Sequence, residues 1–378
     1  MQFMKTTARR KKLALFVALI MALTLWTAVP LTASADTQTS SVEIQATDTV
    51  SEIQAKIQEA LDEDDVETVT VTGTKTDADE TLTLAIPENV TLLWAATYTG
   101  TMEWGVLISL SGEGAFEVGD GGTVSINGES GYAIWADNST IAVRDGGTVS
   151  AVGDYSRGIY VCYNADNPDH ISVIVSGGTV RATGMIGGTD AIYFSGEGSA
   201  VVSGGTVIAE GYECKAIYGA YNLDISGNAS VSTTMDDSTT ISGLNVNIGG
   251  NAIVSSGDNS VTISSAGTVI VNGGTVSATS GNAIQLGFSD LPTGVTVNGG
   301  VVCATTGYAI SLGSIFLTIS DNIKVNGGCI VAYGEEINGQ NNVIYSQYDP
   351  TEFMGPTGTG VVIAWDEAAY DDEPYTFA

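Results

Sequence analysis

The sequence predicts an all-β fold in which the chain winds into a right-handed parallel β-helix, or β-solenoid, of about 11 coils with a short N-terminal capping helix. Two observations carry this prediction: one short pattern recurs at a nearly constant interval, and a second pattern follows most copies of the first. One copy is too short to enclose a core, so its apolar residues become buried only when neighbouring copies stack. Right-handed connections between such parallel strands follow from a strong general preference.

The first pattern is clearest in Val271–Thr279, where a glycine pair precedes alternating residues. A period of two places Val276 and Ala278 on the inner side of a strand and Ser277 on the outer side. The glycines suit a corner, because glycine adopts left-handed backbone angles without steric cost. Gly-Gly or Gly-Asn pairs stand at 121/122, 146/147, 177/178, 204/205, 227/228, 249/250, 273/274, 299/300 and 327/328, in steps of 22 to 31 residues.

Two further rows follow from the same register. Asparagines precede or nearly precede the corner, where stacked amides can bond one another; they are Asn247, Asn272, Asn298 and Asn326. A second strand follows most pairs and contains an inward isoleucine, as in Ala133–Trp135. The residue two positions after the isoleucine also points inward; these residues are Ala136, Val161, Phe194, Gly219, Leu286 and Leu312.

Residues 1–35 predict a signal peptide, with a basic start, an apolar run and small residues at Ala33–Ala35 for cleavage. An uncleaved anchor is the alternative. This leader contains 5 of the 12 basic residues and no acidic one, so the remaining chain has 7 against 43, a net charge of −36. Such a surface repels nucleic acid and anionic lipid. We expect a secreted, monomeric protein with no membrane insertion after cleavage.

Residues 36–105 predict the cap and the irregular first coils. Residues 36–47 show no helical or strand period. Thr49–Leu61 is an amphipathic helix, capped by Thr49 with Glu52 or by Ser51 with Gln54. It covers the open end of the solenoid and blocks edge-to-edge association. Half-buried strands follow over 67–72, 82–86 and 90–94.

Residues 106–333 contain the regular repeats. The coil with the pair 227/228 and the next one, up to Gly257, are degenerate: Asp236–Thr240 replaces the second strand, and we expect a local bulge there. Insertions at 163–170 and 287–294 predict loops on one side of the solenoid, often the binding side. Residues 334–378 depart from the repeat and contain a last strand at Val361–Trp365 and an acidic tail.

Four cysteines, Cys162, Cys214, Cys303 and Cys329, would permit two disulfides in an exported protein. The register places Cys303 and Cys329 on adjacent coils along a diagonal of about 8 Å. That separation is too long for an unstrained bridge. We therefore expect free thiols.

The period, the glycine corners and the Ala-Ile strands make residues 50–365 resemble the right-handed parallel β-helix repeats of exported surface proteins from Gram-positive gut bacteria. Several proteins of that group are labelled as carbohydrate-binding by analogy. The resemblance implies a secreted or cell-surface protein for adhesion or surface display. Its implied partners are glycans or a host or cell-wall surface.

An outward aromatic row is the strongest candidate site. The residues that follow the inward isoleucines on consecutive coils are Trp135, Tyr160, Tyr193 and Tyr218. Exposed aromatic patches sometimes mark binding sites, and flat rings are platforms for sugar rings. The flanking charged residues are Arg157, Asp190 and Lys215, which we interpret as a solvated salt-bridge row. The alternative is that stacked rings only stabilise the coils, at about 0.5–1.5 kcal/mol per pair.

A polysaccharide-active lyase or hydrolase of the β-helix type is the alternative function, and a purely structural spacer is a third. Polygalacturonases of this architecture carry Gly-His-Gly and Arg-Ile-Lys motifs, whereas the one histidine here, His170, has no glycine neighbour. No acid–base pair is recognisable, so we assign no catalytic or metal-binding residue. We expect no cofactor, although weak calcium binding at Asp120–Gly122 or Asp145–Gly147 stays open.

Overall fold

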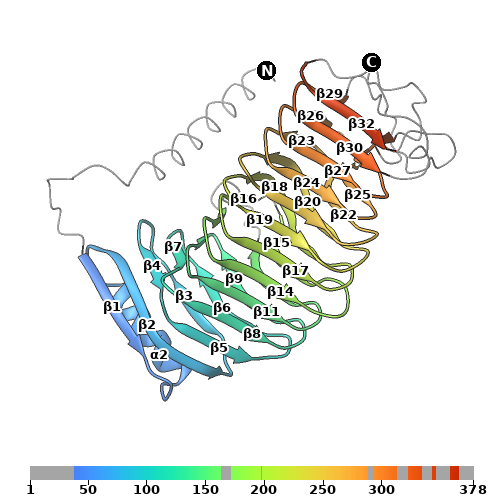
Figure 1. Ribbon diagram of the computed structural model, residues 1–378. Coiled ribbons are helices and arrows are strands. Elements are labelled where there is room, and N and C mark those ends of the chain that lie inside the picture. The colour runs from blue at the N-terminus through green and yellow to red at the C-terminus, as the bar shows by residue number, and fades with distance from the viewer. Residues whose placement is uncertain are drawn as a thin grey trace, which may run out of the picture. The chain divides into compact units, whose positions relative to one another are not determined.

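The computed structural model describes residues 38–162, 172–196, 198–287, 293–312, 322–333, 343–345 and 358–365. In this part the chain is an all-β right-handed parallel β-solenoid of about ten turns, close to the number predicted, with little helix (Figure 1). The predicted signal peptide, the acidic tail, the 163–170 loop with His170, and residues 288–292 of the second insertion lie outside the described residues.

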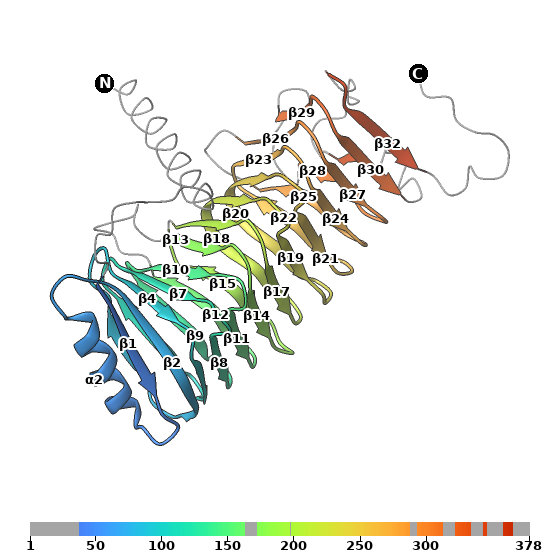
Figure 2. The ribbon, with the colours of Figure 1, turned by 60° about the vertical axis from the view of Figure 1, so that its left-hand side comes forward.

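Each regular turn contributes three strands, and equivalent strands of successive turns pair in parallel to form three faces (Figures 1 and 2). Face 1 contains β1 (Gln38–Ile44), the first part of β2 (Val66–Ala78), β4 (Thr91–Trp94), β7 (Ala115–Val118), β10 (Thr140–Val143), β13 (Ser172–Val175), β16 (Ser199–Val202), the second parts of β18 (Lys215–Ile225) and β20 (Thr239–Ile248), β23 (Thr268–Val271), β26 (Gly294–Val297) and β29 (Ile323–Val325).

Face 2 follows the glycine corner, and face 3 follows a second corner. Face 2 contains the end of β2, β5 (Thr97–Thr101), β8 (Thr123–Asn127), β11 (Thr148–Val152), β14 (Thr179–Thr183), β17 (Thr206–Glu210), β19 (Ser230–Thr233), β21 (Ile253–Ser256), β24 (Thr275–Ala278), β27 (Val301–Ala304), β30 (Cys329–Tyr333) and β32 (Val361–Trp365). Face 3 contains β3 (Leu82–Ala85), β6 (Val106–Ser111), β9 (Tyr132–Asp137), β12 (Arg157–Cys162), β15 (Asp190–Phe194), the first parts of β18 and β20, β22 (Val261–Ser265), β25 (Asn282–Leu286), β28 (Ile310–Ser311) and β31 (Ile344–Tyr345).

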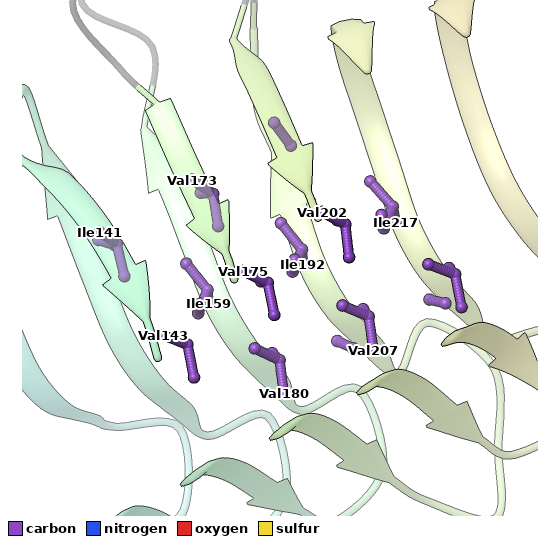
Figure 3. Close-up of a cluster of buried hydrophobic side chains, with 14 of the residues drawn as sticks. Ile141, Val143, Ile159, Val173, Val175, Val180, Ile192, Val202, Val207 and Ile217 are labelled. Atoms are coloured by element: carbon purple, nitrogen blue, oxygen red, sulfur yellow. The ribbon is translucent and has the colours of Figure 1, made fainter. Parts of the chain in front are cut away.

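The core is a set of apolar columns that run along the stacking direction. Ile159, Ile192 and Ile217 occupy the same register position on three successive turns, and each is fully buried (Figure 3). Val276 and Ala278 point inward as predicted, whereas Ser277 between them is partly exposed. Full burial of one such aliphatic side chain contributes about 1.5–3 kcal/mol relative to exposure. The columns therefore specify the strand register as well as the fold.

The N-terminal end differs from the prediction in one respect. Residues 38–44 form strand β1, which pairs in parallel with β2, although residues 36–47 were expected to have no strand. Only two side chains of β1 are buried. The alternation of apolar and polar residues is therefore weak in this edge strand, and the sequence alone did not predict it. Helix α2 (Val50–Leu61) follows, with the predicted capping box between Thr49 and Glu52.

Helix α2 covers the first turn of the solenoid (Figure 2). Ile53 and Ile57 are fully buried. The Gln58 amide donates from Nε2 to the Ala85 carbonyl (3.1 Å) and accepts from the Ala85 N–H at Oε1 (3.1 Å). The Gln54 Oε1 accepts from the Thr83 N–H (3.2 Å). The helix thus satisfies backbone groups of β3 for which no earlier strand of face 3 is present in the described chain, as a cap requires.

Two details of the middle turns correct the predicted register. Gly219 was expected inside but is partly exposed at a bulge, and Ala220 is buried in its place. Asp236–Thr240 was expected to replace the second strand of its turn with a bulge. Instead β20 runs on, with Thr240 and Ile241 buried and Ile241 in register with Ile217. A threonine fills the alanine position because the inner hydroxyl bonds Thr233 Oγ1 at 2.8 Å.

The predicted asparagine row is present. Asn272, Asn298 and Asn326 each donate from Nδ2 to the Oδ1 of the preceding asparagine at 2.8 Å, beginning at Asn247. Asn247 donates to Asp224 at 2.9 Å, so the amide row ends on a carboxylate. Within the described residues the four cysteines form no disulfide with one another, in agreement with the expectation of thiols.

Candidate functional site

The predicted aromatic row lies on face 3, on four successive strands. Ring centroids are 4.6 Å apart between Trp135 and Tyr160, 5.1 Å between Tyr160 and Tyr193, and 4.8 Å between Tyr193 and Tyr218. The Tyr160 and Tyr193 rings are almost parallel, at 7°. We call these four residues the aromatic ladder. The structure thus brings together all four aromatic residues that the sequence singled out.

A fifth ring, Tyr132, extends the ladder and was missed. Its ring lies 5.1 Å from Tyr160 and 5.8 Å from Trp135. Its register partner is Arg157, and the Arg157 Nη1 donates to the Tyr132 hydroxyl at 2.9 Å. The signal was available, because Tyr132 stands two residues before an inward isoleucine, as Arg157 and Asp190 do. That position was interpreted only as a charged row, so the ring at its first member was not included.

Stacking has a consequence for ligand binding. The faces of Tyr160 and Tyr193 cover each other, and the Arg157 guanidinium lies over Tyr193 at 4.1 Å from its centroid. A sugar ring needs an uncovered aromatic face, and inside the ladder only ring edges are presented. The ends of the ladder are therefore the positions where a planar contact with a ligand can form.

The downstream end of the ladder opens into a hollow of about 410 Å³. The next residues in register after Tyr218 are Ser242 and Ser264, so no further ring covers Tyr218 on that side. Small residues form much of the lining, which includes Tyr218, Gly219, Tyr221, Ser242, Gly243 and Ser264. Within the described residues the hydroxyls of Ser242 and Ser264 have no hydrogen bond. The hollow therefore combines the Tyr218 side chain, which also contacts Lys215, with hydroxyl groups beside it.

The charged row is present in register, but its central residue is buried, whereas the prediction was a solvated row. Asp190 stands between Arg157 and Lys215 on adjacent strands and is only 2% exposed. Arg157 Nε lies 3.5 Å from Asp190 Oδ2, and Lys215 Nζ lies 5.3 Å from the Tyr218 centroid. Burial raises the pKa of Asp190, although Lys215 and Arg157 act in the opposite direction. Desolvation is the largest of these effects, and the buried Oδ1 atom has no hydrogen bond within the described residues.

Replacing Asp190 with asparagine should change how stability depends on pH. A carboxyl whose pKa is raised in the folded state stabilises that state fully below its unfolded-state pKa, and this stabilisation is lost as pH rises through the folded-state pKa. The wild type should therefore lose stability relative to the Asp190→Asn variant as the pH rises from acid to neutral. Urea unfolding at several pH values measures the difference in the free energy of unfolding. Glu129→Gln, at an exposed position, controls for the lost charge. A stability difference that is constant with pH would contradict the assignment.

Other site chemistry is limited in the described part of the chain. No group of three or more His, Cys, Asp or Glu residues is placed there to hold a metal ion, and this includes Asp120 and Asp145. Burial raises the pKa of the Cys214 and Cys303 thiols, which disfavours the nucleophilic thiolate. No helix in the described ranges has the length and apolar character needed to cross a membrane.

Comparisons of the chain with protein-family models, with curated proteins and with solved structures found no match.

Proposed function

We propose that the chain is an exported or cell-surface protein for adhesion or surface display, and that it binds a neutral glycan at the downstream end of the aromatic ladder. The observation that carries this proposal is the hollow beside Tyr218, where an aromatic side chain meets small residues and two unbonded hydroxyls. Ligand sites commonly combine an apolar surface with a few polar groups that orient the ligand. The net charge of −36 outside the leader disfavours acidic sugars.

The outer surface agrees with a role in recognition or display. Face 2 presents threonine and serine at its outward positions, as Thr275 and Ser277 show. The glycine corner presents the asparagine row beside them. Such hydroxyl and amide rows keep a long solenoid soluble and offer hydrogen bonds to a partner.

The first test is a glycan array with the purified chain, with and without calcium, beside a polysaccharide-degradation assay. Binding without cleavage supports the proposal. Cleavage would favour the enzyme alternative and direct attention to Arg157 and Lys215. No binding and no cleavage would leave the structural spacer.

The substitution Ser242→Tyr tests the position of the site. A tyrosine there would continue the ladder, fill the hollow and cover Tyr218, so glycan binding should fall at least about tenfold. Folding stability should stay level or rise by about 0.5–1.5 kcal/mol from one more ring pair. Ser232→Tyr adds the same side chain at a partly exposed position on face 2 and should leave binding unchanged. Equal binding by Ser242→Tyr and the wild type would remove the hollow from the proposal.

A further inference from the structure

The second corner, where the chain passes from face 2 to face 3, presents apolar side chains to solvent. Nine large hydrophobic residues are exposed within the described part of the chain, and all but Ile253 and Val361 lie at this corner. They are Trp104, Val152, Tyr155, Met185, Ile186, Tyr212 and Met235, with exposed fractions between 41% and 78%. We call these seven residues the apolar ridge.

The ridge follows the stacking direction. Val152 to Met235 come from four consecutive turns of the solenoid, and Trp104 comes from two turns earlier. The strands on both sides of the corner are paired in register, so equivalent corner residues line up. From the Trp104 turn to the Met235 turn there are five steps of about 4.8 Å, which gives about 24 Å.

The turns that carry the ridge are held by specific contacts. The Asp154 carboxylate accepts hydrogen bonds from the backbone N–H groups of Met185 (2.6 Å) and Ile186 (3.0 Å), one turn further along. Gly188 has φ +85° and approaches the Tyr155 ring so closely that an added Cβ would lie 2.9 Å from it. The Tyr212 hydroxyl is hydrogen-bonded to Asp237. The apolar side chains are thus presented from fixed turns.

The charge around the ridge is acidic. The carboxylates on the corner turns are Glu103, Glu129, Asp154, Glu213, Asp236 and Asp237, and all except Asp154 are exposed. The nearby basic side chains already have contacts: Arg181 with Glu210, Arg157 with Asp190, and Lys215 over the Tyr218 ring. A partner for this corner therefore needs apolar groups flanked by positive charge.

We propose that the apolar ridge is a docking surface for a cationic amphipathic helix. The apolar stripe of such a helix covers the ridge, and its lysines or arginines face the carboxylates on both sides. The helix pitch of 5.4 Å is close to the spacing of the turns, and about 16 residues at 1.5 Å each span the 24 Å ridge. This surface lies at a different corner from the hollow beside Tyr218, so the proposal does not depend on glycan binding.

The test uses a synthetic Leu/Lys amphipathic peptide of about 16 residues, with binding to the purified chain followed by fluorescence anisotropy. We expect the double variant Met185→Ser/Ile186→Ser to bind it at least about tenfold more weakly. Both side chains are exposed, and the hydrogen bonds to Asp154 involve only the backbone, so folding should be retained. Met235→Ser provides an independent second variant on the ridge. Ile253→Ser is the matched control, because Ile253 is 52% exposed and lies off the ridge.

Two further peptides complete the test. A peptide with serine in place of leucine should lose most binding, and one with glutamate in place of lysine should not bind. Wild-type affinity of both ridge variants for the Leu/Lys peptide would overturn the proposal. Equal affinity of the wild type for the Leu/Lys peptide and for the peptide with serine in place of leucine would also overturn it, because charge alone would then explain the binding. Binding of phosphatidylcholine vesicles that is lost in the ridge variants would also overturn it, in favour of a lipid surface.

Discussion

Replacing Gly274 with alanine should destabilise the solenoid by about 2–5 kcal/mol, through backbone strain and overpacking together. Gly274 turns the glycine corner with φ +74°, and an added Cβ would lie 2.4 Å from the Ala252 carbonyl oxygen. That oxygen cannot move away freely, because it accepts the Thr275 N–H at 2.8 Å. Urea unfolding followed by circular dichroism measures the change.

Two other corner glycines separate the two causes. Gly121 has φ +83° with no atom near an added Cβ, so Gly121→Ala should cost only the strain of about 1–2 kcal/mol. Gly249 has open space and an ordinary φ, so Gly249→Ala should stay within about 0.5 kcal/mol of the wild type. Equal losses for all three variants would show that neither strain nor crowding at the corner determines stability.

The same corner shows why the fold could be predicted from the sequence. The glycine pairs and the inward positions Val276 and Ala278 can be recognised from residues that are close together in the sequence. Because the turns stack, the same positions of successive repeats pair in register. The asparagine row followed by the same logic, since an asparagine stands one or two residues before the glycine pair in four turns. In a repeat of this kind, the contacts between residues of different turns can therefore be predicted from a short sequence pattern.

The details that were predicted wrongly depend on three-dimensional context. In Ile217–Ala220 either Gly219 or Ala220 can point inward, and only the neighbouring strands decide between them. The burial of Asp190 depends on the side-chain packing around it, including Arg157, which register alone does not specify. Strand β1 has one neighbour and little buried surface, so its sequence shows almost no pattern.

For the candidate site, the sequence predicted that the rings lie on one face, but it did not predict how the rings contact one another. Stacking at about 5 Å follows from the spacing of parallel strands, and it covers the ring faces that a sugar would need. The apolar ridge was missed because all its members except Val152 stand in turns, where no period of two or 3.6 applies. A Met-Ile pair inside a glycine-rich turn, at Gly184–Gly188, was the visible signal.

Replacing Ile57 with aspartate should release helix α2 and make the chain associate. Ile57 is fully buried against the first turn, and burying an unpaired carboxylate there costs several kcal/mol. If the helix leaves, Leu82 and Leu84 become accessible, and the β3 backbone groups bonded to Gln54 and Gln58 lose their partners. An open strand edge of this kind pairs with other chains.

Light scattering and size-exclusion chromatography measure the association, and Ala55→Asp is the matched control. Ala55 lies on the exposed side of the same helix, so this variant adds the same charge without disturbing the packed side. Gln58→Leu keeps the helix packed while removing its bonds to Ala85, and it should cause weaker association than Ile57→Asp. If Ile57→Asp stayed as monodisperse and as stable as Ala55→Asp, the end of the solenoid would not need this helix. Association by Ile57→Asp alone would show that an edge-covering helix, in addition to the −36 charge, keeps the chains apart.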